Sequence, residues 1–484
     1  MNRRNFTKHS AVAASAAFVP GSGTGQAVSK PGKSDSCRVK PGGARVIVAG
    51  GGIAGLSTAY ELMKRGHDVT VLEASRRAGG HVRTMHKPLD DGLYADIGAE
   101  QCTKPGYEIY RAYAKEFGLE LLPYPRRTTQ ITYIKDKPYT EEMLRDRKIL
   151  QGFGYNKREA AYMSEHGMNS LPGLYYAPYL DMFEDEYQPL GIGLDELDHI
   201  AVKDLLKREK ASEKAVQIYG SAFTSALQAL WQSAILKHRK VPVMPTQLFR
   251  IKGGNQRMTD AFAKRLGQRV RLGAPITKIE HGESGVNIHF KESGQAKSTS
   301  ADYLVSAIPL TTLLRVTVEP RWSAEKAWVI QNTMFDFQSR VVFQARTPFW
   351  KRDGHSPNMA CRSHHLHLVW EMAEEVEGDR SILIGAASAG TTAEQALAAY
   401  RRRYPGTSVD IERTLVHHWI QDPWAPFCER RGFGLGRLKK FWPEILRPHG
   451  RIHFAGAYAD NLTWGQEAAT RSAHRVAEEI DESS

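Results

Sequence analysis

Residues 44–75, ARVIVAGGGIAGLSTAYELMKRGHDVTVLEAS, place a glycine-rich turn between an apolar run and a helical pattern, and this arrangement restricts the fold more than any other feature. The apolar run suits a buried parallel strand, and Gly50, Gly52 and Gly55 form G-x-G-x-x-G directly before the helix. The first glycine permits a tight turn, the second lets the backbone approach a pyrophosphate, and the third allows close helix packing. The next strand ends at Glu73, where a carboxylate can accept hydrogen bonds from a ribose diol. The stretch therefore predicts a dinucleotide-binding strand–helix–strand unit.

A second glycine turn follows in ASRRAGGHVRT, with arginines close to the same phosphates. Together with Glu73 it resembles the E-x-x-x-R-x-G-G-R stretch of two-dinucleotide-fold flavoproteins, and specifically of the flavin amine oxidase family, so that FAD rather than NAD is the expected cofactor. His81 departs from the family, which usually has Arg there. A backbone contact survives that change, whereas a side-chain contact to phosphate or flavin would need Arg83 instead.

The other FAD-binding stretches of the family follow in order, so the resemblance extends from Ala44 to Ile480. YADIGAEQ (94–101) is similar to the strand and turn that run past the flavin, and FRIKGGNQRMTDAFAKRL (249–266) to the glycine pair before a helix. Residues 270–290 and 301–309 are similar to the strands that complete the nucleotide domain. GRIHFAGAYADNLTWGQEAATRSAHRVAEEI (450–480) is similar to the final strand, turn and helix. One departure is Ala457, where the family often has Glu.

The resemblance implies an α/β fold with one bound FAD, in which a Rossmann-like two-dinucleotide-binding FAD domain is combined with a mixed α+β substrate domain. The order of the motifs makes the FAD domain discontinuous, at residues 44–127, 245–310 and 425–484. The substrate domain would take residues 128–244, which are mostly helical in pattern, and 311–424. The residues implied to contact FAD come from all of these motifs: Gly50, Gly52, Ile53, Ala54, Gly55, Glu73, Ala74, Arg76 or Arg77, Gly79, Gly80, His81, Arg83, Gly98, Ala99, Ile276, Gly456 and Cys428.

Length and composition fit this organisation. At ~150 residues per domain, 484 residues predict about three domains or two large interleaved ones. Apolar residues make up 41% and charged residues 25%, as in an ordered soluble protein, and no window reaches the ~18 consecutive apolar residues of a membrane span. The net charge of +13 favours anionic surfaces or substrates, but no Lys and Arg run with interleaved aromatics indicates nucleic-acid binding. The cysteines are widely spaced, so no metal site is expected.

The chain opens with MNRRNFTKHSAVAASAAFVPGSGTGQA, a basic start followed by a weakly apolar stretch and small residues. Arg3 and Arg4 resemble the twin-arginine signal, which exports proteins that have already folded, often around a cofactor. We therefore expect residues 1–27 to be a signal peptide recognised by the twin-arginine translocase and residues 28–43 to be a flexible linker. The protein would then be periplasmic or secreted.

In this family the flavin accepts a hydride from the carbon that bears the amine nitrogen, so the protein needs few reactive side chains. The resemblance implies a dry, aromatic-walled pocket, hydrolysis of the imine, and return of the flavin to its oxidised form with formation of H2O2. Candidate walls are Trp419, Trp424, Phe433 and Trp464, and for each of them plain core packing is an equal alternative.

Three positions bear on the substrate and on the flavin. L-amino acid oxidases of this family hold the substrate carboxylate with an Arg where this chain has Gln101, with Lys104 nearby, which argues against a free α-amino acid. Where many members keep a Lys that holds water near the flavin, this chain has Arg315 or Thr317. Cys428 stands at the spacing of the flavin-attaching cysteine of animal monoamine oxidases, but the residues after it do not match, so coincidence is the favoured interpretation over covalent FAD.

The function expected from these residues is an FAD-dependent oxidase that converts an amine and O2 to an imine and H2O2, with Arg315, Trp419, Trp464 and Gln101 as candidate catalytic residues. The nearest alternative is an L-amino acid oxidase. A second alternative is an FAD-dependent dehydrogenase or desaturase that passes electrons to a quinone, and a third is a basic protein that retains FAD structurally. The oligomeric state stays open, with a homodimer as one candidate.

Overall fold

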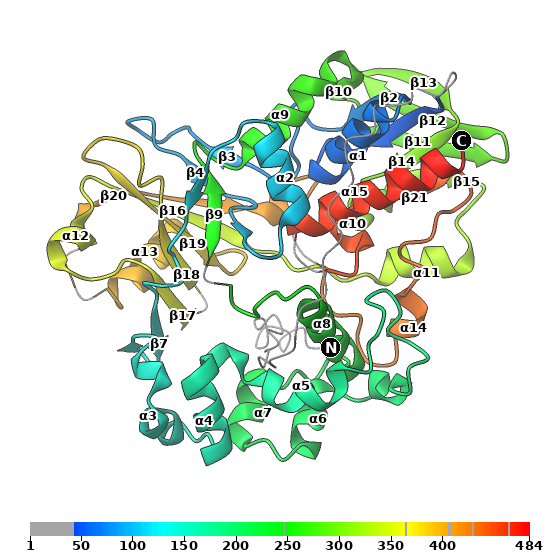
Figure 1. Cartoon of the computed structure of the whole chain (residues 1–484). Helices are drawn as coiled ribbons and strands as arrows, with labels where there is room; N and C mark the ends of the chain where they lie inside the picture. The colour runs from blue at the N-terminus through cyan, green and yellow to red at the C-terminus, as the bar shows by residue number, and fades with distance from the viewer. Residues whose placement is uncertain are drawn as a thin grey trace, which may run out of the picture. The chain divides into compact units, whose positions relative to one another are not determined.

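The computed structural model describes residues 43–245, 247–363, 365–404, 406, 408–427, 430–462 and 465–484 (Figure 1). The predicted signal peptide and nearly all of the predicted linker lie outside these residues, as do Cys428 and Trp464. The described residues form two compact units. The smaller unit comprises residues 141–245 and 432–439, and the larger unit takes the rest of the described chain.

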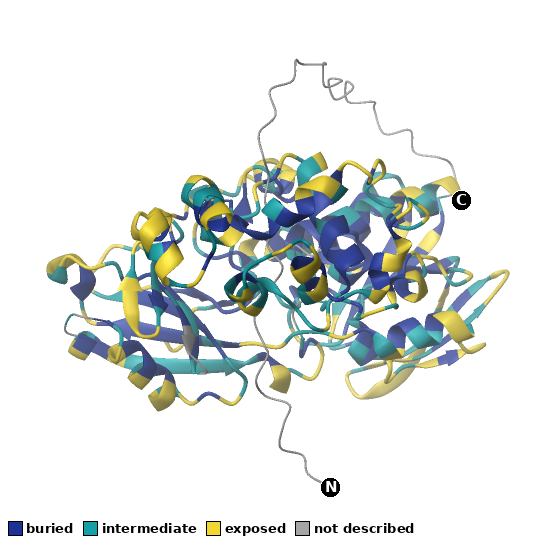
Figure 2. Ribbon diagram, turned by 90° about the horizontal axis from the view of Figure 1, so that it is seen from below, coloured by how far each residue is buried: buried dark blue, intermediate teal, exposed yellow. Residues whose placement is uncertain are grey.

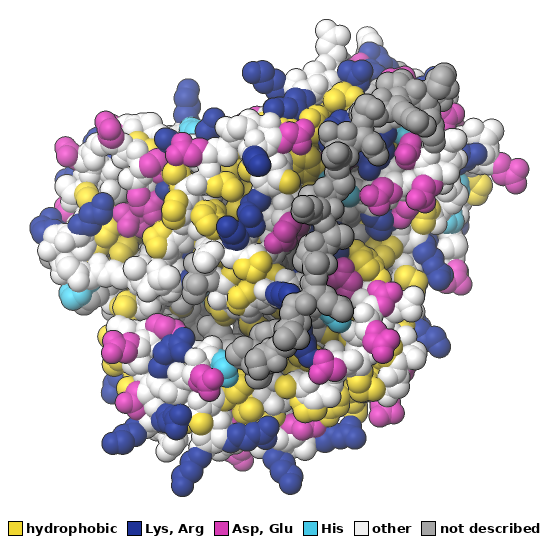
Figure 3. Space-filling model, in the orientation of Figure 1, with side chains coloured by type: hydrophobic (Ala, Val, Ile, Leu, Met, Phe, Trp, Pro, Cys, Tyr) yellow, Lys and Arg dark blue, Asp and Glu magenta, His cyan; other side chains and the backbone are white. Residues whose placement is uncertain are grey.

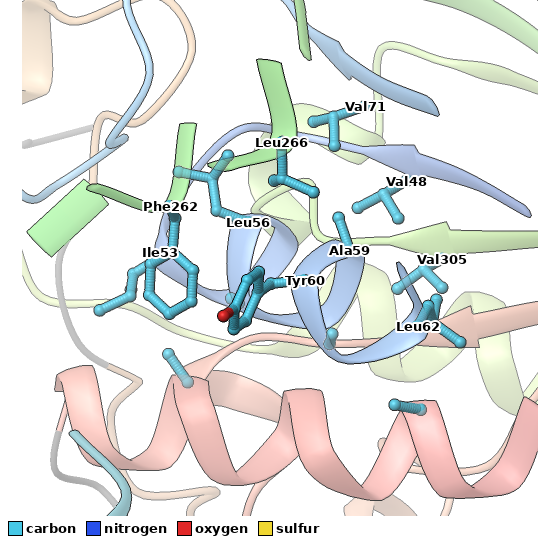
Figure 4. Packing of buried hydrophobic residues seen from close by; sticks show 14 of the residues in the cluster. Val48, Ile53, Leu56, Ala59, Tyr60, Leu62, Val71, Phe262, Leu266 and Val305 are labelled. Carbon is cyan, nitrogen blue, oxygen red and sulfur yellow. The ribbon is translucent and has the colours of Figure 1, made fainter. Parts of the chain in front are cut away.

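A five-stranded parallel sheet lies in the larger unit, and it confirms the strand–helix–strand unit predicted around the first glycine turn. Its strands are, in order, β10 (Val270–Leu272), β2 (Asp68–Glu73), β1 (Arg45–Ala49), β14 (Tyr303–Ser306) and β21 (Ile452–Phe454). Because helices cover it, β1 is buried from its second residue onward. The covering helices are α1 (Ile53–Lys64), α9 (Gln256–Leu266) and α15 (Gly465–Glu482). Figure 4 draws the shared core: Val48, Ile53, Leu56, Ala59, Tyr60, Leu62, Val71, Phe262, Leu266 and Val305.

The remaining strands near the nucleotide fold form small sheets in the larger unit. A four-stranded sheet has the order β13 (Gln295–Ala301), β12 (Gly285–Glu292), β11 (Ile276–Gly282) and β15 (Thr317–Glu319). Two further sheets pair β3 (Thr84–Met85) with β4 (Ala95–Asp96), and β9 (Leu248–Ile251) with both β5 (Cys102–Thr103) and β6 (Leu121–Pro123). Helix α2 (Glu108–Glu116) follows β5, and the short helices α10 (Leu310–Leu313) and α11 (Ala324–Asn332) also belong to the larger unit. The first two residues of α14 (Leu438–Phe441) are assigned to the smaller unit and the last two to the larger unit.

A seven-stranded sheet forms a further part of the larger unit. Its order is β20 (Ile411–His418), β16 (Ser339–Ala345), β19 (Ser381–Ala387), β18 (Leu366–Met372), β17 (Met359–Ser363), β7 (Ile131–Ile134) and β8 (Lys137–Tyr139). Side chains alternate between its faces, so Val341 and Phe343 pack with α13 (Ala393–Arg401), near the short α12 (Phe349–Asp353). Val342 and Trp370 pack on the opposite face with Ile97. β7 and β8 extend this sheet although they fall at the start of the segment predicted as a helical insert.

The smaller unit is helical, as the sequence pattern of the insert indicates. Its α-helices are α3 (Arg147–Gly152), α4 (Lys157–His166), α5 (Pro172–Leu180), α6 (Val202–Arg208), α7 (Glu213–Tyr219) and α8 (Ala226–His238). Asn156 begins α4 with a capping box, because its side chain accepts from the backbone N–H of Glu159 while the Glu159 carboxylate accepts from the N–H of Asn156. Tyr175, Tyr176 and Phe183 are buried, so these aromatic side chains belong to the core of the smaller unit.

Burial and charge follow the usual division between interior and surface. In Figure 2 the central strands and the inward helix faces are mostly buried, whereas exposed residues lie on outer helix faces, on loops and on outer strands such as β13. On the face drawn in Figure 3, Lys and Arg side chains are interspersed with Asp and Glu. No helix among the described residues is both long and apolar enough to span a membrane.

Candidate cofactor and substrate site

The first glycine turn is shaped by contacts that leave no room for side chains at two of its three motif positions. Gly50 has φ +110°, and a Cβ on Gly55 would lie 2.0 Å from the carbonyl oxygen of Gly50. A Cβ on Gly52 would meet only the Cα of Gly80, at 4.0 Å. Gly52 therefore faces open space, directly before the first amides of α1, which have no acceptor within the helix. This is the arrangement that binds a phosphate at a helix N-terminus.

Glu73 stands at the end of β2 beside this turn. Its carboxylate accepts hydrogen bonds from the backbone N–H of Gly51, at 2.5 Å, and of Ser75, at 2.7 Å. The backbone around Glu73 also receives the N–H groups of Gly273 and Ala274, which lead into β11. Ile276, the predicted adenine contact, is the first residue of β11, so the fold brings it to the side of the turn where Glu73 lies.

The second glycine turn lies against the first. The N–H of Gly79 donates to the carbonyl of Gly51 at 2.7 Å, and Gly79 forms a parallel bridge with Gly52. Arg77 holds this turn because its guanidinium donates to three carbonyls, those of Ala78, Gly80 and Val82. The sequence offered Arg76 or Arg77 as the arginine near the phosphates. Arg77 is the one that positions the turn, whereas the Arg76 side chain is exposed.

An aromatic stack lies where the second turn meets the loop 97–101. The His81 ring stacks on Trp419, and the indole N–H of Trp419 donates to the carbonyl of Ile97 at 2.7 Å. His417 approaches the edge of Trp419 with ring centroids 4.8 Å apart and planes at 89°. Gly98 packs so closely here that a Cβ would lie 1.8 Å from the carbonyl oxygen of His81. Burial lowers the pKa of His81 and of His417 to about 4, so both rings are neutral at neutral pH.

Several buried polar atoms around these loops have no hydrogen-bond partner within the described chain. They are His81 Nε2, Gln101 Oε1, Ser306 Oγ, His417 Nε2 and Gln466 Oε1. The Gln466 amide donates to the carbonyl of Gln101 at 3.1 Å, which places the N-terminus of α15 beside the loop 97–101. Because buried polar groups are normally paired, these atoms are suited to a ligand with both donors and acceptors. FAD carries both on its flavin ring, and the missing side chain of Gly52 leaves room for the approach of its pyrophosphate.

The turn between β21 and α15 contributes a second group of contacts at the carboxyl end of the parallel sheet. The N–H of Gly456 donates to Ser472 Oγ at 2.9 Å, and a Cβ on Gly456 would lie 2.6 Å from the ring of Tyr458. The Tyr458 hydroxyl lies 3.3 Å from the carbonyl oxygens of Ser306 and Ile308, at the end of β14. The glycine turn and the carboxyl end of the parallel sheet therefore meet, which is where such sheets bind nucleotides.

Two predicted catalytic residues share this site, and a third does not. Gln101 and Trp419 lie at the loop 97–101. Arg315 is exposed and donates to the carbonyl of Pro423 at 2.8 Å, and Thr317 is also exposed, so neither has the buried setting that a water-holding residue needs. Trp424 is 38% exposed. Phe433 is buried in the smaller unit, where its N–H donates to Gln228, which favours core packing for this residue.

A buried ionic cluster, which the sequence motifs do not indicate, lies on the other side of the loop 97–101. It consists of Glu100, Arg126, Arg340 and the ring of Trp370. The signal in the sequence is an arginine at the start of an otherwise apolar strand, RVVFQA, and a tryptophan in a similar run, LVWEM. Among the described residues, no group of three His, Cys, Asp or Glu side chains could hold a metal ion.

Comparison with known proteins agrees with this geometry. The model of the family described as "Flavin containing amine oxidoreductase" matches residues 53–481. An L-amino-acid oxidase of Siganus canaliculatus is 26% identical over 464 residues, covering 90% of this chain and 85% of the relative. L-amino acid oxidase Bs29 of Bothriechis schlegelii is 24% identical over 463 residues, covering 91% of this chain and 90% of the relative.

Solved structures share the fold. Wild-type putrescine oxidase bound to putrescine has a TM-score of 0.73 at 22% identity, covering 90% of this chain and 98% of that chain. Cyclohexylamine oxidase from Brevibacterium oxydans IH-35A has a TM-score of 0.75 at 20% identity, covering 91% of this chain and 99% of that chain. The predicted α/β class with a Rossmann-like FAD domain is confirmed.

Proposed function

The chain belongs to the flavin-containing amine oxidoreductase family, and from that premise we propose that it is an FAD-dependent oxidase that converts an amine to an imine while O2 is reduced to H2O2. Bound FAD supplies the acceptor for the hydride that leaves the amine's α-carbon, and O2 then takes up the electrons. Water hydrolyses the imine to an aldehyde or ketone and releases ammonia or an amine.

The role of the protein is to bind the amine in its neutral form and to exclude water from it. The single observation that supports this is the stack of His81, Trp419 and His417, which presents uncharged aromatic surface beside both glycine turns. A buried neutral wall disfavours an ammonium ion, so the pKa of a bound amine would fall. The neutral amine keeps the lone pair that assists loss of hydride from the adjacent carbon.

The cofactor would be held by the residues that shape the two turns. The amides at the start of α1, together with Gly52, would bind the pyrophosphate, and Glu73 would bind the ribose diol. Arg77 keeps the second turn in place. The N-terminus of α15, with Gln466, would contact the ring system or the adjoining chain of the flavin.

An L-amino acid oxidase is the second candidate. Two relatives named as L-amino-acid oxidases match nearly the whole chain, which supports it. Gln101 stands where that class keeps a carboxylate-binding Arg, which counts against the usual clamp. Hydrogen peroxide release separates the candidates: the purified holoenzyme is given a panel of primary and secondary amines and a matched panel of L-amino acids. Peroxide from neither panel, with a bound flavin present, would contradict both functions.

We also propose that the protein is exported by the twin-arginine translocase and works outside the cytoplasm. The support is the sequence of residues 1–27, with its paired Arg3 and Arg4. Changing both arginines to lysine would keep the charge and remove the recognised pair. We expect the protein to accumulate in the cytoplasm after that change, and unchanged export would contradict the proposal.

A further inference from the structure

Four helices of the smaller unit carry an excess of basic residues on one side. Residues 147–158, from the start of α3 to the start of α4, include no acid and four basic residues: Arg147, Lys148, Lys157 and Arg158. Residues 203–214, which cover most of α6 and the start of α7, contain four lysines, one arginine and three acids. On the smaller unit, Figure 3 shows Lys and Arg side chains along the lower edge, where Figure 1 places α3, α4, α6 and α7. We call residues 147–158 and 203–214 the basic face.

The two segments of the basic face lie side by side. The N–H of Ser212, in the turn between α6 and α7, donates to Glu159 Oε1 at 2.9 Å, so this turn lies against the start of α4. A Cβ on Gly154, in the turn between α3 and α4, would lie 3.5 Å from the Cβ of Lys214. Helices α6 and α7 also pack against each other. The basic residues of both segments therefore form one surface within the smaller unit.

The lysines of this surface are not neutralised inside the smaller unit. Within the described part of the chain, four of them have neither an ion pair nor a side-chain hydrogen bond: Lys203, Lys207, Lys210 and Lys214. Of the neighbouring acids, Glu209 accepts from the hydroxyl of Tyr179 at 2.6 Å. Asp204 and Glu213 are exposed and leave the surface with a net positive charge. Such a surface attracts anionic groups from outside the protein.

A closed loop beside the basic face exposes an aromatic ring. Phe223 is 70% exposed, more than any other Phe or Trp among the described residues. Its loop, residues 220–225, is closed by Ser221, whose Oγ accepts from the N–H of Phe223 at 3.2 Å and of Thr224 at 3.0 Å. The N–H of Lys203 donates to the carbonyl of Ser221 at 3.1 Å, which joins the loop to the start of α6. The Phe223 ring therefore meets solvent although hydrogen bonds hold its backbone in place.

The combination of unpaired lysines and an exposed ring fits one kind of partner best. Lysines are attracted to anionic lipid headgroups, and an aromatic ring is stabilised at the boundary between headgroups and acyl chains. A duplex nucleic acid or an acidic polysaccharide would pair with the lysines but leave the ring in water. Because no described helix is long and apolar enough to span a membrane, contact through this surface would be peripheral and reversible.

We propose that the basic face and Phe223 form a docking surface for a membrane that contains anionic phospholipids. Headgroup phosphates would lie against Lys203, Lys207 and Lys210, and the Phe223 ring would enter the lipid just beyond them. This surface lies wholly in the smaller unit, so the proposal does not depend on the identity of the amine.

The test measures binding of the purified full-length holoenzyme to lipid vesicles by flotation. Vesicles of phosphatidylglycerol and phosphatidylcholine in equal amounts should bind at least about tenfold more strongly than vesicles of phosphatidylcholine alone. About 0.5 M NaCl should release most of the bound protein, since the electrostatic part is screened. A triple variant, Lys203→Gln with Lys207→Gln and Lys210→Gln, should bind the anionic vesicles about tenfold more weakly or worse. Phe223→Ser should weaken binding about threefold or more.

The matched control removes the same charge from the larger unit. It combines Lys115→Gln, Lys264→Gln and Lys291→Gln, three exposed lysines that have no ion pair among the described residues. This control variant should bind anionic vesicles as the wild type does. Flavin content and unfolding temperature show whether each variant is folded.

Phe223→Trp keeps the test decisive if the triple variant of the basic face fails to fold. The tryptophan emission that this variant adds to that of the wild type should shift to shorter wavelength with anionic vesicles and stay unchanged with phosphatidylcholine.

Four results would overturn the proposal. They are equal binding to the two kinds of vesicle, equal losses in the two triple variants, wild-type binding in Phe223→Ser, and an unshifted emission in Phe223→Trp. Wild-type binding in every variant would place membrane attachment in another part of the chain. A single-stranded oligonucleotide that binds through the same three lysines, without any binding of vesicles, would assign the basic face to nucleic acid instead.

Discussion

His81 stacks on Trp419 with ring centroids 4.0 Å apart and ring planes 27° from parallel. The contact places a neutral imidazole where the family usually has a guanidinium. Arg77, Arg340 and Asp422 are the charged groups that influence His81, and two of these three are cations. The structure around this position is therefore built for an uncharged ring.

Replacing His81 by Arg should lower the stability of the FAD-free chain by about 3 kcal/mol, because a permanent charge would enter a buried position near two other cations. Thermal or urea unfolding measures the change. The control is Arg76→His, which makes the reverse exchange between the same two residue types at an exposed position. It should change the free energy of unfolding by less than about 0.5 kcal/mol. Similar effects of the two substitutions would contradict the neutral environment assigned to His81.

Replacing Trp419 by Phe should keep the ring contact with His81 and remove the donor to the carbonyl of Ile97. Leaving that buried carbonyl unpaired should cost about 1–2 kcal/mol of unfolding free energy. Trp424→Phe provides the comparison, since Trp424 is 38% exposed and should tolerate the change. If the two variants lose the same stability, the hydrogen bond does not contribute as described.

Gly52 and Gly55 should respond differently to Ala. A Cβ on Gly52 would have only Gly80 Cα nearby, at 4.0 Å, so Gly52→Ala should fold normally without FAD but bind FAD at least about tenfold more weakly, because the methyl group fills the space for the pyrophosphate. A Cβ on Gly55 would lie 2.0 Å from the Gly50 oxygen, so Gly55→Ala should destabilise the chain itself. Unfolding temperatures and FAD titrations measure the two effects. If Gly52→Ala bound FAD with wild-type affinity, the pyrophosphate would not occupy the space beside Gly52.

Glu467 should make stability depend on pH. Its carboxylate accepts from the N–H groups of Ile109 and Tyr110 at the start of α2, yet burial raises its pKa from 4.5 to about 7. Between these two values the folded chain keeps a proton that the unfolded chain has lost, so the free energy of unfolding falls as pH rises through this range. The loss is on the order of 3 kcal/mol, and it is nearly complete by about pH 8.

Glu467→Gln should remove this contribution to the slope, so the stability of the variant relative to the wild type should increase from pH 4.5 to pH 8. The amide oxygen can accept from only one of the two N–H groups, which lowers the stability of the variant by a similar amount at both pH values. Urea unfolding across this range gives the difference directly. Glu478→Gln, at an exposed position of the same helix, should leave the slope as it is. A slope that persists in Glu467→Gln would assign the pH dependence to another buried carboxyl such as Asp96, whose pKa burial also raises to about 7.

The parts of the site that could be predicted from sequence are those set by local spacing. Gly50, Gly52 and Glu73 lie in one strand–turn–helix–strand unit, where backbone geometry restricts the residue type at each position. The choice between Arg76 and Arg77 was open, because neighbouring residues in a turn point in different directions and only the turn's geometry decides which one reaches the carbonyls.

The substrate side could not be derived in the same way. Arg340 reaches Gly98 because β16 pairs with β19 and β20, and the register of those strands is a long-range property that no short motif encodes. Arg315 was selected because it stands where many members of the family keep a Lys that holds water near the flavin, yet it follows the short α10 and donates to the exposed carbonyl of Pro423. The domain boundaries at 128 and 244 stay predictions, although β7 and β8 pair with β17 in the larger unit's sheet.

The most direct test of the central claim is an anaerobic titration of the purified holoenzyme with an amine substrate found in the peroxide panel, followed by readmission of air. The account predicts that the visible absorbance of the flavin is lost after one equivalent of amine per flavin, and that air restores it with release of one equivalent of H2O2. Bleaching that air does not reverse, but a quinone does, would contradict an oxidase and favour a dehydrogenase. Absence of bleaching with every amine and amino acid would contradict amine oxidation itself.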